Sequence, residues 1–157
     1  MRGGYLTAVF TAATVLLGTW EGVDHTAKHQ RIDPPGVITW CRGRTNYDDP
    51  SVKVGTYFTT AQCDGLLKQD LPRYNAMIDR CIHVPLGVNE RAAMLSFVYN
   101  VGQGTLCKSS VARGFNAGNH KAGCEALMRF TRANGVVLRG LENRRRDERK
   151  LCLTRDT

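Results

Sequence analysis

The feature that most restricts this chain is an uncharged stretch near the N-terminus, "YLTAVFTAATVLLGTW" at residues 5–20. A stable membrane-spanning helix needs about 20 predominantly apolar residues, whereas this stretch is shorter and contains four threonines. The residues that follow it offer only a weak candidate for the small-x-small cleavage site of a signal peptide. Two interpretations remain open: an anchor that enters a membrane and later joins the folded protein, or a buried N-terminal helix.

Size and composition indicate a single folded domain, with room for two lobes, in a chain of 157 residues. Hydrophobic residues make up 42% and charged residues 23%, which argues against disorder. The net charge of +8 favours an anionic partner, such as nucleic acid, a phospholipid surface or an acidic cell-wall polymer. The densest charged run, "RGLENRRRDERK" at 139–150, is interpreted as a solvated helix face, with an anion-binding patch as the alternative.

The pattern of apolar and turn residues predicts an α+β fold. Short alternating segments over residues 37–58 predict a small antiparallel sheet. Helices follow from Thr59, where Gln62 completes a capping box. Pro72 is expected to kink or break the first of them, Asn89 to cap the apolar helix "ERAAMLSFVYNV", and two more are expected around 119–133 and 140–152. A β lobe and a helical lobe would then meet at a cleft.

Six dispersed cysteines show no C-x-x-C pair and no zinc-ligand spacing, so no metal is expected. Their even number favours disulfides and an oxidising compartment, and the alternative is buried free thiols in a cytosolic protein. Six cysteines allow fifteen pairings. The order of the expected elements favours local links, namely Cys41 with Cys63, Cys81 with Cys107, and Cys124 with Cys152.

One pair of carboxyl groups could support glycoside hydrolysis, which needs a protonated acid beside the leaving oxygen and a second group that handles water. Glu21 follows the apolar stretch and Trp20, and such surroundings raise the pKa of a carboxyl group. Asp33 lies twelve residues later, and Thr39 follows by six and can orient a water by hydrogen bonding. Helix ends and proline turns produce similar spacings by capping alone.

Five segments together resemble a known family. "WEGVD", "GVITWCRGRT", "TTAQCDGLLKQDL", "LSFVYNVGQG" and "GLENRRRDERKLC", in this order, are similar to the endolysins of tailed phages, the phage-type lysozymes of glycoside hydrolase family 24. The resemblance runs from Trp20 to Leu153. The apolar front end further resembles the signal-anchor-release subgroup, whose members are held inactive at the inner membrane and then freed into the periplasm to cut peptidoglycan.

This resemblance implies a lysozyme-like fold with an anchor at residues 1–20 and a catalytic domain at 21–157. Within that domain it implies a β lobe at about 33–58 and a helical lobe at about 59–157. It assigns Glu21 as general acid and Thr39 as the residue that positions water. It also implies that Asn100, in "SFVYNVG", contacts substrate, although the neighbouring Phe97 and Val101 are better suited to the core. It further implies that Arg144 and Arg145 hold the C-terminal helix in place.

The resemblance allows two alignments for the base, because the family spacing is Glu, eight residues, Asp or Cys, five residues, Thr. Five residues do separate Asp33 from Thr39, but eleven separate Glu21 from Asp33. Either three residues are inserted before Asp33, which we favour, or the family's base is replaced by Gln30. Asp24 is a third candidate.

The resemblance implies a muramidase that hydrolyses the β-1,4 bond between N-acetylmuramic acid and N-acetylglucosamine. It would act as a monomer on peptidoglycan strands, without cofactor, metal or nucleic acid. It would reside first at the inner membrane of the host and then in the periplasm. Two alternatives are a lytic transglycosylase and a non-catalytic, disulfide-stabilised cationic module that binds the cell wall.

Overall fold

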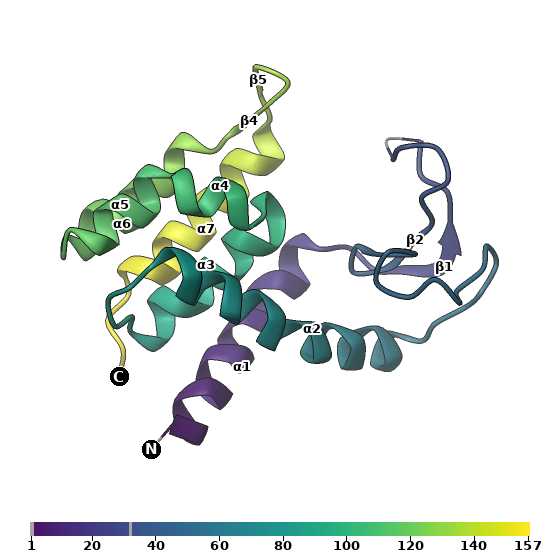
Figure 1. Ribbon diagram of the computed structural model, residues 1–157, viewed down its shortest axis with the longest axis horizontal. Helices are drawn as coiled ribbons and strands as arrows, with labels where there is room; N and C mark the ends of the chain where they lie inside the picture. The colour runs from purple at the N-terminus through teal and green to yellow at the C-terminus, as the bar shows by residue number, and fades with distance from the viewer. Residues whose placement is uncertain (1, 32) are drawn as a thin grey trace. The chain divides into compact units, whose positions relative to one another are not determined.

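The computed structural model describes residues 2–31 and 33–157, which divide into two compact units. Gly18–Asp70 forms one of them, called here the sheet unit. The described chain up to Leu17, together with Leu71–Thr157, forms the other, called here the helical unit. Helices combine with small antiparallel sheets, so the predicted α+β class is confirmed (Figure 1).

The uncharged N-terminal stretch is part of α1 (Arg2–Trp20). Val9, Ala13 and Leu17 recur every four residues on one face of this helix, and all three are fully buried. Val9 and Ala13 belong to the main apolar core of the helical unit. Among the described residues, α1 is also the one helix long and apolar enough to cross a membrane, judged by length and composition.

The sheet unit is built on three antiparallel strands in the order β1 (Asp24–Lys28), β2 (Thr39–Cys41) and β3 (Arg44–Thr45). The central strand β2 is buried along its whole length. Its Trp40 stacks on Phe58, with ring centroids 6.0 Å apart. The sheet begins at β1, earlier than the range 37–58 predicted from the sequence.

The predicted capping box opens α2 (Thr60–Cys81) and is confirmed. The Thr59 N–H donates to Gln62 Oε1 at 2.8 Å, and the Gln62 N–H donates to Thr59 Oγ1 at 3.1 Å. Of the kink or break expected at Pro72, the break is wrong, because α2 continues through this residue. Pro72 is exposed, so its ring faces solvent and the helix gives up the hydrogen bond that the missing N–H would make.

The helical unit is organised around α3 (Val88–Val101), whose residues 91–98 are all buried. The C-terminal helix α7 (Arg139–Leu153) packs against it. The helix expected over 119–133 is shorter and ends in a 3-10 turn and a hairpin. The remaining elements of this unit are α4 (Gln103–Lys108), α5 (Ser110–Asn116), α6 (His120–Glu125), η1 (Ala126–Arg129), β4 (Arg132–Ala133) and β5 (Val136–Val137).

The arginine-rich run on α7 is not uniformly solvated, which corrects the sequence interpretation. Arg144, Arg145 and Glu148 are buried. Arg145 Nε lies 2.6 Å from Glu148 Oε2, and Ser96 Oγ donates to Glu148 Oε1 at 2.6 Å. Burial raises the pKa of the Glu148 carboxyl group, and the charge of Arg145 and the hydroxyl of Ser96 act against that rise. Arg144 Nη2 donates to the Ser96 carbonyl oxygen at 3.0 Å, and the Arg145 guanidinium lies over the Phe97 ring. The two arginines therefore hold α7 against α3, as the resemblance implied.

The N-terminus of α3 is capped differently from the prediction. Asn89 lies inside the helix, and the N-cap is Gly87, whose N–H donates to Glu90 Oε2 at 2.9 Å. The carboxylate of Asp156 accepts the N–H groups of Val88 at 2.6 Å and Asn89 at 2.9 Å. The C-terminal tail thus supplies the acceptors that the first turn of α3 lacks.

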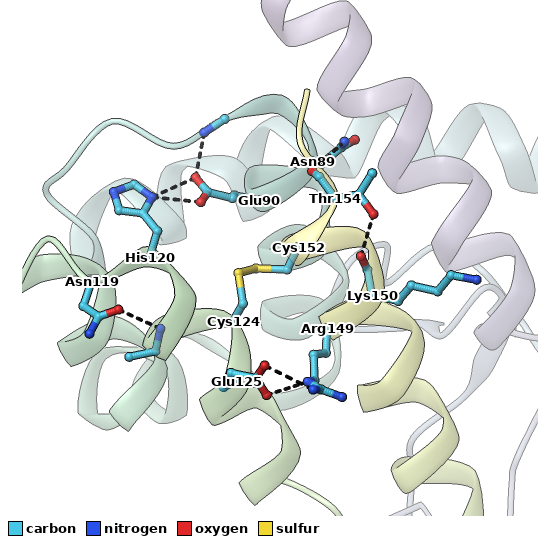
Figure 2. Close-up of a disulfide and its surroundings, with 12 residues drawn as sticks. Asn89, Glu90, Asn119, His120, Cys124, Glu125, Arg149, Lys150, Cys152 and Thr154 are labelled. Carbon is cyan, nitrogen blue, oxygen red and sulfur yellow. Dashed lines mark hydrogen bonds and ion pairs between the residues drawn. A yellow bond between two sulfur atoms is a disulfide. The ribbon is translucent and has the colours of Figure 1, made fainter. Parts of the chain in front are cut away.

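The three predicted disulfides are confirmed: Cys41–Cys63 in the sheet unit, and Cys81–Cys107 and Cys124–Cys152 in the helical unit. Figure 2 shows the last of these joining α6 to α7. An ion pair between Glu125 and Arg149, with Arg149 Nε 2.6 Å from Glu125 Oε2, joins the same two helices beside it.

Candidate functional site

A polar pocket of about 420 Å³ lies within the sheet unit. Its lining comes from the segment between α1 and β1, the start of β1, the loop between β1 and β2, and the β2–β3 hairpin. The predicted acid, base and water-positioning residue all line it. The full set is Glu21, Gly22, Val23, Asp24, Gln30, Asp33, Thr39, Cys41, Gly43 and Thr45.

Asp33 and Thr39 are in direct contact. Thr39 Oγ1 donates a hydrogen bond to Asp33 Oδ2 at 2.6 Å. Thr39 is buried and lies on the central strand, where it is paired with Lys28 on one side and Thr45 on the other. A hydroxyl that donates its proton to a carboxylate keeps two lone pairs that can accept a hydrogen bond from water. The pair can therefore hold a water and remove its proton.

Glu21 follows the last residue of α1, where its backbone is held by an arginine. Arg42 Nη1 donates to the Glu21 carbonyl oxygen at 2.8 Å. The same guanidinium binds Asp64 of α2, with Nε and Nη2 at 3.1 and 2.9 Å from Oδ1. Arg42 thus holds the backbone of Glu21, the predicted acid. Sequence reasoning missed Arg42, because an arginine in a turn carries no spacing signal that distinguishes it from a surface arginine.

The other two candidates for the base contact each other. Gln30 Nε2 donates to Asp24 Oδ2 at 2.8 Å, and Lys28 Nζ lies 2.7 Å from Asp24 Oδ1. Both carboxylate oxygens of Asp24 are therefore engaged. Of the three candidates, Asp33 is the one whose side chain is hydrogen-bonded to Thr39. This geometry favours Asp33 as the base.

The turn between β2 and β3 contributes backbone to the pocket in an unusual conformation. Gly43 has φ +84°, which suits glycine, but Cys41 has φ +54°, which a residue with a side chain rarely adopts. The left-handed conformation costs about 1 kcal/mol for such a residue. The disulfide to Cys63 ties Cys41 to α2 and stabilises this turn.

The remaining predicted site residue, Asn100, lies near the end of α3 in the helical unit and is exposed. It does not line the pocket of the sheet unit, and its contact with substrate stays a prediction. Within the part of the chain that the structure describes, no group of three or more His, Cys, Asp or Glu side chains could hold a metal ion.

Comparisons with known proteins identify the family of the chain. The family model for phage lysozyme matches residues 18–148. An SAR-endolysin of Bacteriophage PS119 is 40% identical over 148 residues, which cover 93% of this chain and 87% of the relative.

Two solved structures are similar over most of their length. The muramidase domain of SpmX from Asticaccaulis excentricus superposes with a TM-score of 0.81 at 30% identity, covering 92% of this chain and 96% of that one. The active form of the P1 phage endolysin Lyz superposes with a TM-score of 0.74 at 25% identity, covering 98% and 93%. By the extent of the family match and of the identity to its relatives, this chain belongs to the phage lysozyme family.

Proposed function

We propose that the chain is an endolysin, a muramidase of glycoside hydrolase family 24 that hydrolyses the β-1,4 bond between N-acetylmuramic acid and N-acetylglucosamine in peptidoglycan. Glu21 is the general acid that gives its proton to the leaving glycosidic oxygen. Asp33 is the base that takes a proton from the attacking water, and Thr39 positions that water. The enzyme works as a monomer on glycan strands, and Asn100 contacts the substrate.

The hydrogen bond from Thr39 Oγ1 to Asp33 Oδ2, in a pocket that Glu21 also lines, carries this proposal. The reaction needs an acid on one side of the scissile bond and a base with a water on the other. A carboxylate already paired with a buried hydroxyl supplies the second requirement. The polar lining of the pocket suits a sugar, which is recognised mainly through its hydroxyl and amide groups.

We also propose that α1 first serves as a membrane anchor and that residues 21–157 form the catalytic domain, with a β lobe at about 33–58 and a helical lobe at about 59–157. The polar side chains of α1 support this route. Thr7, Thr11 and Thr14 each donate to the carbonyl oxygen four residues earlier, at 2.7–2.9 Å. Such bonds satisfy the hydroxyls inside the helix, which lowers the cost of placing them in lipid.

The buried face of α1 supports the second half of the route. Val9, Ala13 and Leu17 gain apolar contacts when the helix joins the folded protein, and this gain favours departure from the membrane. Before this departure, the enzyme is held inactive at the inner membrane of the host. After it, the enzyme is free in the periplasm, where peptidoglycan lies.

The test is the exchange Glu21→Gln, which keeps the size of the side chain but removes the acid. We expect release of reducing sugar ends from purified peptidoglycan to fall by a factor of about 100 or more, as for loss of a general acid, with the thermal midpoint unchanged. Glu142→Gln, an exchange of a glutamate that is ion-paired to Arg146 on α7, is the matched control and should keep full activity.

The products separate the proposed hydrolase from the alternatives. Mass spectrometry of the fragments should show reducing N-acetylmuramic acid ends. Anhydro-muramic ends would instead identify a lytic transglycosylase, which needs only the acid. Binding to peptidoglycan without any cleavage would identify a cationic binding module, and full activity of Glu21→Gln would remove Glu21 from the mechanism.

A further inference from the structure

The loop between β1 and β2 carries Asp33 and is the part of the site that needs support. Eleven residues separate Glu21 from Asp33 along the chain. A longer loop has more conformations to restrict before its residues take fixed positions. Across its base, His29 Nδ1 lies 2.8 Å from the carbonyl oxygen of Val37. That contact ties the two ends of the loop but does not place Asp33.

A second set of contacts does place Asp33. The side chain of Gln30 is held by Asp24, at 2.8 Å, and Asp24 is the first residue of β1. The main chain of Gln30 then holds Asp33, because the Gln30 carbonyl oxygen accepts the N–H of Asp33 at 3.1 Å. The contact of the Gln30 side chain with Asp24 therefore helps to hold the backbone of Asp33.

Further contacts through the sheet connect Asp33 back to Asp24. Asp33 accepts the hydroxyl hydrogen bond of Thr39 on β2, and Thr39 is paired across the ladder with Lys28 on β1. The ammonium group of Lys28 returns to Asp24, 2.7 Å from Oδ1. These contacts thus link both ends of β1 to Asp33 and to Thr39. A displacement of Gln30 would break the contact of this network that lies nearest to Asp33.

The identity of residue 30 follows from the same geometry. Its side chain meets a carboxylate at 2.8 Å, so it must be a hydrogen-bond donor. An amide nitrogen donates to Asp24, whereas a carboxylate at that place would repel it. Gln30 therefore suits a supporting residue and does not suit the base.

We propose that Asp24 and Gln30 are positioning residues, which hold the loop so that the carboxylate of Asp33 meets Thr39 and the attacking water. This inference rests on the proposed function, in which Asp33 is the base. The two residues act through Asp33, so their loss should affect turnover and leave the affinity for the glycan nearly unchanged.

The experiment measures kcat and KM on soluble peptidoglycan fragments of one length. We expect Gln30→Ala and Asp24→Ala each to lower kcat about 10-fold, because misplacing a reacting group by about 1 Å can cost up to 100-fold, with KM within twofold of its original value. Because both exchanges open the same contact, the double variant should lose little more than either single variant. Asp24→Asn keeps an oxygen that can accept from Gln30, and it should recover most of the lost kcat.

Gln62→Ala is the matched control, since it also removes a glutamine with a 2.8 Å hydrogen bond in the sheet unit, at the start of α2. It should lower the thermal midpoint and leave kcat unchanged. Equal loss of kcat in this control, or multiplicative losses in the double variant, would show general destabilisation and overturn the proposal.

Gln30→Asp tests the opposing assignment. The proposal expects it to lose at least as much kcat as Gln30→Ala, because two carboxylates would face each other. A gain of activity would instead place the base at residue 30. If the proposed function itself is wrong, the unaltered chain releases no reducing ends. If the unaltered chain is active and Gln30→Ala keeps its kcat, only the positioning role is overturned.

Discussion

The hydroxyl of Thr39 is the smallest group on which the proposed chemistry depends. Thr39→Val keeps the shape of the side chain but removes the donor to Asp33 Oδ2, a contact of 2.6 Å. The water then loses one of its two partners and the carboxylate loses the bond that orients it. We expect kcat to fall about 100-fold, the lower end of what a positioned proton acceptor contributes, while Thr39→Ser retains most of the activity.

Thr56→Val provides the comparison for this exchange. The Thr56 hydroxyl also donates a hydrogen bond within the sheet unit, to the Lys53 carbonyl oxygen at 2.8 Å, but it is exposed and does not line the pocket. Its removal should leave kcat unchanged. A Thr39→Val variant that kept its kcat would show that water is held by another group.

The sequence predicted which residues line the pocket but not how they are held there. Glu21, Asp33 and Thr39 could be chosen because an acid after an apolar helix and the interval from base to threonine both match the family. The choice between Asp33 and Gln30 could not be made from spacing, because an insertion can lie on either side of residue 30. The hydrogen bond from Thr39 favours Asp33, whose role as base stays a prediction. Arg42 was missed because its partner on Glu21 is a backbone carbonyl, which leaves no trace in the sequence.

Between α6 and α7, the ion pair of Glu125 and Arg149 makes stability depend on pH (Figure 2). Hydrogen bonding from Arg149 lowers the pKa of the Glu125 carboxyl group in the folded protein. A carboxyl group with a lowered folded pKa contributes stability above its unfolded pKa of about 4.3. That contribution is lost as the pH falls through the lower folded value.

Arg149→Gln should therefore lower the free energy of unfolding above about pH 5, and the difference from the original chain should vanish well below pH 4. Urea unfolding followed by circular dichroism between pH 3 and pH 7 measures this difference. In a Glu125→Gln background the same exchange should have an effect independent of pH. A difference that stayed constant across the range in the original background would contradict the assignment of the lowered pKa to this pair.

Elements with strong apolar periodicity or a capping motif were predicted well, and those without were not. The strand β1, "DHTAK", was missed because only Ala27 is buried, so it shows no alternation of apolar and polar residues. The cap of α3 was wrongly placed at Asn89. The carboxylate that accepts the Asn89 N–H belongs to Asp156, which lies 67 residues away in the sequence. Local sequence rules cannot find a cap that the fold brings from the other end of the chain.

The three disulfides close separate loops, with sequence separations of 22, 26 and 28 residues. Because these loops neither overlap nor nest, the restriction that each places on the unfolded chain is nearly independent of the others. On the chain-entropy account, loops of this length stabilise by about 3.5 kcal/mol each, or about 10 kcal/mol together. The whole free energy of unfolding of a domain is about 5–15 kcal/mol.

We therefore expect the chain to fold stably only in an oxidising compartment such as the periplasm. Guanidinium unfolding of the reduced and alkylated protein should show loss of the native state near 37 °C. Each paired exchange of two cysteines for serine should lower the free energy of unfolding by about 3.5 kcal/mol. The three paired exchanges should add, because their loops are separate. Active, folded enzyme recovered from a reducing cytosol with its thiols free would contradict this expectation and would mean that apolar packing alone suffices.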